Sequence, residues 1–90
     1  MARTARLVRS PATLWRTGPF GTVLLAPGDA EPQALDATAA VVWAALAEPA
    51  SAIELARDLA VAFDADESIV AADLAPLLDA WLASGAVEER

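Results

Sequence analysis

The stretch QALDATAAVVW, residues 33–43, contains the point at which a strand-like first third of the chain gives way to helices. Residues 33–35 follow Pro32 and are predicted as a short strand; because proline cannot donate a ladder hydrogen bond, an edge strand suits this position. Asp36 is a good N-cap for a helix over about residues 37–47. This helix places one apolar stripe at helical spacing: Ala39, Val42, Trp43 and Leu46.

Two more strands are predicted before this junction. Residues 14–16 are extended in character and end at the turn signal Thr17-Gly18-Pro19. Residues 22–25 are apolar or β-branched and lie between glycine- and proline-containing turns, which predicts a buried strand. Residues 1–12 carry arginine and no acid, and we expect them to form a flexible basic arm ahead of a domain over residues 13–90.

Two more helices are predicted after the junction. Ser51 and Glu54 have the spacing of a capping box, which opens a helix to about Phe63. Its predicted buried face comprises Ile53, Ala56, Leu59, Ala60 and Phe63. Asp64 or Asp66 then caps a third helix, for which Gly85 supplies the C-terminal stop.

Pro76 lies in the middle of this third helix, where a proline removes one backbone hydrogen bond. A kink or a short break near Asp73 is therefore expected. The apolar residues of the helix are Ile69, Val70, Leu74, Leu77, Leu78, Trp81 and Leu82. Three short antiparallel strands followed by three helices predict an α+β fold of the winged helix-turn-helix kind.

The amino-acid composition excludes several kinds of catalytic and metal-binding chemistry. The chain has 90 residues, of which 57% are hydrophobic, and it contains no Cys, His, Lys or Tyr. Thiol nucleophiles, imidazole bases and most zinc or haem ligands are therefore missing. We expect a protein that is not an enzyme and that uses no cofactor and no metal.

Charge is unevenly distributed along the chain. Residues 1–28 hold four arginines and no acid, whereas residues 29–90 hold all thirteen acids and two arginines, for a net charge of −7. The acidic part should repel nucleic acid. No apolar run is long enough for a membrane span or for the core of a signal peptide, so we expect a cytoplasmic protein without membrane contact.

Several alternative sites fit less well. Asp64, Asp66 and Glu67 could suggest a calcium loop, but the sixth position of that loop is Ile69 where a glycine is needed. Ser68 lies in a context similar to the attachment serine of acyl carrier proteins, but the strand-like first third has no counterpart in that family. A winged helix suggests DNA binding, yet the third helix carries acids and no basic residue.

The order of the predicted strands and helices along the whole chain resembles that of one known protein family. Residues 23–28 and 33–43 resemble the apolar strand and the strand-to-helix junction of the PqqD family. The similarity continues through the capping box at 51–54, residues 63–66 and residues 85–87, and it covers about residues 13–88. Three positions depart from the family pattern: Asp36 stands for Asn, Glu48-Pro49 for Asp-Gly, and Pro76 interrupts the third helix.

This resemblance implies a recognition element for ribosomally synthesised and post-translationally modified peptides (RiPPs). Such a module binds the leader of a precursor peptide and presents it to a modifying enzyme, such as a radical-SAM maturase. An alternative is a structural or DNA-linked winged-helix module without a peptide ligand.

We expect the leader to add a strand along residues 33–35 and to fill a groove against the third helix. The acids of that helix would favour a leader with Lys or Arg. The candidate peptide-binding residues are Glu31, Gln33, Ala34, Leu35, Val70, Asp73, Leu74, Leu77, Leu78 and Trp81. The other possibility is that the N-terminal arm covers this strand.

Overall fold

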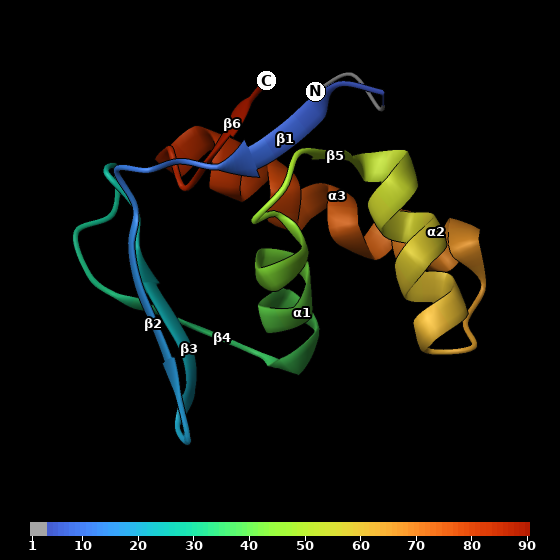
Figure 1. The fold of residues 1–90 in the computed structure, drawn as a ribbon, viewed down its shortest axis with the longest axis horizontal. Coiled ribbons are helices and arrows are strands. Elements are labelled where there is room, and N and C mark those ends of the chain that lie inside the picture. The colour runs from blue at the N-terminus through green and yellow to red at the C-terminus, as the bar shows by residue number, and fades with distance from the viewer. Residues whose placement is uncertain (1–3) are drawn as a thin grey trace.

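A computed structural model of the chain describes residues 4–90 (Figure 1). The fold is α+β, with two small antiparallel sheets and three helices, and the predicted order of strands followed by helices is confirmed. The elements are β1 (Arg6–Arg9), β2 (Leu14–Gly18), β3 (Gly21–Leu25), β4 (Gln33–Leu35), α1 (Ala37–Ala45), β5 (Ala50–Ser51), α2 (Ala52–Ala62), α3 (Glu67–Ser84) and β6 (Val87–Glu89).

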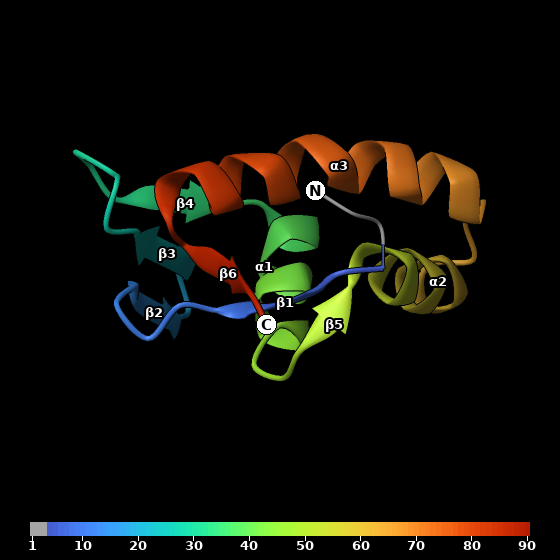
Figure 2. The same cartoon turned by 90° about the horizontal axis from the view of Figure 1, so that it is seen from above.

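The three predicted strands form one sheet in the order β2-β3-β4. Strands β2 and β3 make a hairpin that extends away from the helices in Figure 1. Because side chains alternate along a strand, Leu24 and Thr22 face inward and are buried, while Val23 and Leu25 belong to the outer face. Helix α1 lies between this sheet and α2 in both Figure 1 and Figure 2.

A second sheet, in the order β5-β1-β6, was not predicted and corrects the boundary of the expected flexible arm. Within the predicted arm of residues 1–12, Arg6–Arg9 is a strand, and its Leu7 is fully buried in the core. Residues 1–3 of that arm lie outside the described residues. The partners of β1 are β5 and the C-terminal β6, and pairing over such a distance leaves no local signal in the sequence.

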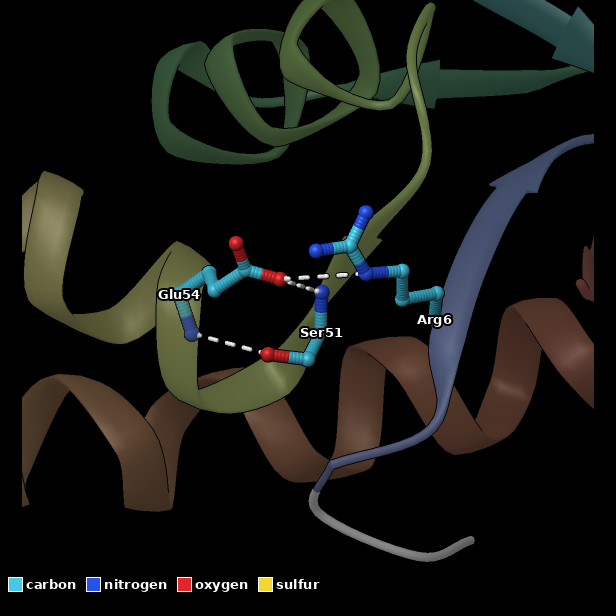
Figure 3. A network of polar contacts seen from close by, with 3 residues as sticks. All are labelled: Arg6, Ser51 and Glu54. Carbon is cyan, nitrogen blue, oxygen red and sulfur yellow. Dashed lines mark hydrogen bonds and ion pairs between the residues drawn. The ribbon is translucent and has the colours of Figure 1, made fainter.

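The predicted helix starts are confirmed. The Asp36 carboxylate accepts a hydrogen bond from the backbone N–H of Ala39 at 2.8 Å, as expected of an N-cap. Ser51 and Glu54 form both hydrogen bonds of a capping box, and Arg6 of β1 approaches the Glu54 carboxylate at 3.9 Å (Figure 3). Asp66, rather than Asp64, caps α3.

Helix α3 is continuous from Glu67 to Ser84, so the break considered at Pro76 does not occur. Pro76 and Ala72 both lie on the exposed side of the helix, where water can hydrate the carbonyl group that Pro76 leaves without a donor. The buried residues Leu74 and Leu78 hold the helix against the core on either side of the proline. The helix ends at Gly85 in the left-handed conformation, as predicted.

The core confirms the apolar stripe of α1, of which all four residues are buried. Trp43 of α1 meets Trp81 of α3 edge to face, with ring centroids 5.4 Å apart.

The predicted buried face of α2 is partly wrong, because Leu55 is buried while Phe63, at the C-cap, is 54% exposed. Ile69, in the first turn of α3, is also exposed.

We predict that Trp43→Ala lowers the free energy of unfolding by about 3–5 kcal/mol, because it leaves a large cavity where α1 crosses α3. Chemical denaturation followed by far-UV circular dichroism measures this loss. The control is Val61→Ala on α2, whose side chain is 80% exposed and whose loss should change stability by less than about 0.5 kcal/mol. A loss below about 1 kcal/mol for Trp43→Ala would contradict the packing described here.

A second prediction concerns the capping box. The Ser51 backbone N–H, with help from the Ser51 hydroxyl and Arg6, holds the pKa of Glu54 below its usual value of 4.5. A depressed pKa stabilises the fold above the unfolded-state value, and this stabilisation is lost as the pH falls through the folded-state value. Glu54→Gln should therefore be less stable than the native chain at about pH 7, and the difference should narrow toward about pH 3.

Urea titrations across this pH range measure the difference. The matched control is Asp58→Asn, an exposed acid of the same helix that takes no part in the cap. A gap between native chain and Glu54→Gln that stays constant with pH would show that the carboxylate charge does not contribute to the cap.

Candidate functional site

A depression of about 440 Å³ lies where the three helices meet. It begins at the N-terminus of α1, directly after β4, and extends between α2 and α3. Its lining residues are Asp36, Thr38, Ala39, Leu59, Phe63, Val70, Asp73, Leu74 and Leu77. Most of these side chains are apolar, and two carboxylates are among them, so the depression suits an apolar group with a positive charge beside it.

Four of the predicted site residues come together in this depression: Val70, Asp73, Leu74 and Leu77. Their spacing of three and four residues places them along one side of α3. Leu78 and Trp81, predicted for the same groove, are fully buried instead and belong to the core cluster with Trp43. These two side chains anchor α3 to the core and do not line the depression.

The predicted residues before α1 lie at a sheet edge. Strand β4 pairs with β3 in the register Thr22 opposite Leu35 and Leu24 opposite Gln33, and within residues 4–90 its other edge pairs with no strand. Gln33 and Ala34 are exposed, whereas Leu35 packs partly against the core. Glu31 lies exposed in the loop before this strand.

The sequence left open that the N-terminal segment covers the β4 edge, and residues 4–12, the part of this segment that the structure describes, form no strand beside β4. Residues 6–9 pair with β5 and β6 on another side of the molecule. Figure 2 shows that the order β2, β3, β4 leads toward α3. The free edge of β4 therefore lies on the α3 side of its sheet, and the depression begins where β4 ends.

Sequence reasoning missed the part of the depression that α1 and α2 provide. Thr38 was not singled out, and Leu59 and Phe63 were assigned to the buried face of α2. Phe63 is four residues after Leu59 and so continues the same face, but α2 ends there and leaves the ring at the rim. A large apolar residue at a predicted helix end was the available signal.

Two other kinds of feature are absent from residues 4–90. No group of three or more acidic side chains is close enough together to hold a metal ion within this range. No helix in the same range is long and apolar enough to cross a membrane.

Comparison with known proteins gives two matches. The family model described as coenzyme PQQ synthesis protein D (PqqD) matches residues 21–87. The chain is also similar to the solution NMR structure of the PqqD truncation of Methylobacterium extorquens PqqCD, described as a functional and stand-alone RiPP recognition element. That similarity has a TM-score of 0.73 at 25% identity and covers 92% of this chain and 88% of the other. No curated protein matches the chain.

Proposed function

Because the chain belongs to the PqqD family, we propose that it is a RiPP recognition element that binds the leader of a precursor peptide. In this proposal it is a non-catalytic cytoplasmic protein that presents the leader to a modifying enzyme, such as a radical-SAM maturase. The similarity to a solved stand-alone recognition element supports this role. The structural observation that carries it is the free edge of β4 beside an apolar depression.

The leader binds as an added strand. The outer edge of β4 offers backbone N–H and C=O groups that no strand within residues 4–90 uses, and an extended peptide can satisfy them in an antiparallel or a parallel ladder. Backbone pairing at Gln33, Ala34 and Leu35 contributes affinity for any extended chain. It does not distinguish one peptide sequence from another, so specificity comes from side chains.

The depression provides that specificity. Alternate side chains of an added strand point to the same side, so one set can reach the apolar wall formed by Val70, Leu74 and Leu77. Asp73 belongs to the same wall, and Glu31 is exposed near the start of β4. The preferred leader therefore places Leu, Ile or Phe in the depression and Lys or Arg beside Asp73.

The winged-helix alternative of DNA binding finds no support in the charges of α3. Glu67, Asp73 and Asp79 lie on this helix, Asp66 caps it, and it has no basic residue. Such a helix is repelled by phosphate in a DNA groove. Leader binding is therefore the function that the site favours.

The first test of strand addition leaves the protein unchanged. A synthetic cognate leader is methylated on one backbone nitrogen at a time, and binding is measured by isothermal titration. In a β-ladder only every second amide of the added strand points at its partner, so methylation should weaken binding about tenfold at alternate positions. Loss at every position, or at none, would show that the leader binds in another way.

The charge at the rim gives a separate prediction. Asp73→Lys should weaken binding of a basic leader about tenfold at low salt, with a smaller loss at high salt because ions screen the interaction. Asp79→Lys is the matched control, since Asp79 is an exposed acid of the same helix that does not line the depression. Equal losses in the two variants would mean that only net charge matters and that the leader does not contact Asp73.

A further inference from the structure

The hairpin of β2 and β3 presents a second exposed surface on the opposite edge of the sheet from β4. Strand β2 pairs only with β3 within residues 4–90, so its outer edge is also free. Leu14, Trp15 and Phe20 are 68%, 47% and 62% exposed. Together with Arg9 and Arg16 they form what we call the β2 surface.

Two depressions flank this surface, one on each face of the hairpin. The outer one, of about 410 Å³, is lined by Leu14, Trp15, Arg16, Phe20, Val23, Leu24, Leu25 and Pro32. The inner one, of about 270 Å³, is lined by Arg9, Trp15, Thr17, Thr22, Ala40, Val41, Trp43 and Ala44. Each contains an arginine and no acid, whereas the depression beside β4 contains two acids and no base.

The exposed aromatic rings are held in place. The Phe20 ring lies against Gly18, where a Cβ atom would come within 2.7 Å of it, so the missing side chain at Gly18 makes room for the ring. Trp15 meets Trp43 edge to face with centroids 6.2 Å apart, and the Arg9 guanidinium lies 4.6 Å from the Trp15 ring centroid. Rings fixed in this way lose little freedom on binding, which favours an interface.

The arginines of this surface have no acidic partner. Within residues 4–90 neither Arg9 nor Arg16 makes a salt bridge, although the chain contains thirteen acids. All the acids occur from residue 29 onward, so the hairpin itself has none. Charge is thus separated in space, with a basic edge at β2 and an acidic site beyond β4.

We propose that the β2 surface binds the modifying enzyme, through a segment of that enzyme that carries apolar side chains and Asp or Glu. This inference rests on the proposed function, since it names the second partner of a recognition element. Arg16, which makes no salt bridge within residues 4–90 and lies with exposed Leu14, Trp15 and Phe20 around the outer depression, defines the chemistry of that partner. A second copy of this chain is the less suitable occupant. Two chains that each carry a net charge of −7 repel each other, and a symmetric contact would also set one basic β2 surface against the other.

The positions of the two sites fit a ternary complex. The leader adds to the β4 edge, whereas the enzyme occupies the β2 edge and the outer face of the hairpin, so both can be bound together. A leader bound to β4 becomes the next strand of the β2-β3-β4 sheet, so it also contributes to the outer face of that sheet. An enzyme that lies across this face therefore reaches the peptide that it modifies.

The experiment titrates a purified radical-SAM maturase, the class of modifying enzyme proposed above, with the full chain in the presence and absence of leader. Arg16→Glu and Phe20→Ser should each weaken enzyme binding about tenfold, while leader affinity stays unchanged. The matched controls lie at exposed positions of α2: Arg57→Glu makes the same charge reversal, and Val61→Ser likewise replaces an exposed apolar side chain with serine. Both should bind the enzyme like the native chain.

Four results would overturn the inference. One is the absence of enzyme binding, and another is an equal loss in the test and control variants. The third is competition between leader and enzyme, which would place both at β4. Self-association that Phe20→Ser abolishes, without an effect on enzyme binding, would assign the surface to a second copy. A chain that binds enzyme but no leader would instead contradict the proposed function, so the two failures are distinguishable.

Discussion

The edge-to-face contact between Trp43 and Trp81 is the interaction on which the rest of the structure depends. It holds α1 against α3 at the centre of the core, and Trp15 extends the aromatic cluster from Trp43 to the β2-β3-β4 sheet. Both buried indole N–H groups lack a hydrogen-bond partner within residues 4–90, at a cost of about 1–3 kcal/mol each. The large apolar area that the two rings bury offsets this cost.

This core sets the geometry of both proposed sites. Because α1 is fixed against α3, its N-terminus, where β4 ends, lies beside Val70, Asp73 and Leu74. The same helix supports Trp15 and, through it, the inner face of the hairpin. Acids are confined to the part of the chain after residue 28, and the sheet places that part at one edge and the arginine-bearing part at the other. One small domain thereby presents two surfaces of opposite charge.

Strand β1 completes the domain by joining parts of the chain that are distant in sequence. It pairs with β5 before α2 and with β6 after α3, and Arg90 donates a backbone hydrogen bond to Arg6 at 2.8 Å. Leu7 adds to the core from this strand. Residues 6–9 therefore connect the strand before α2 with the strand after α3 and do not occupy the β4 edge.

Local signals in the sequence determined the helix caps at Asp36 and Ser51, the three strands β2, β3 and β4, and the apolar stripe of α1, because each depends on residues within one turn or one strand. The resemblance of the strand-to-helix junction also indicated the family. Only the tertiary structure decided which apolar residues of α3 line a depression and which are core: Leu77 and Leu78 are adjacent in sequence, but successive helix residues point in different directions, and the packing of α3 places Leu77 in the depression and Leu78 in the core. It also decided the pairing of β1, since the choice of a distant partner depends on how the whole chain packs.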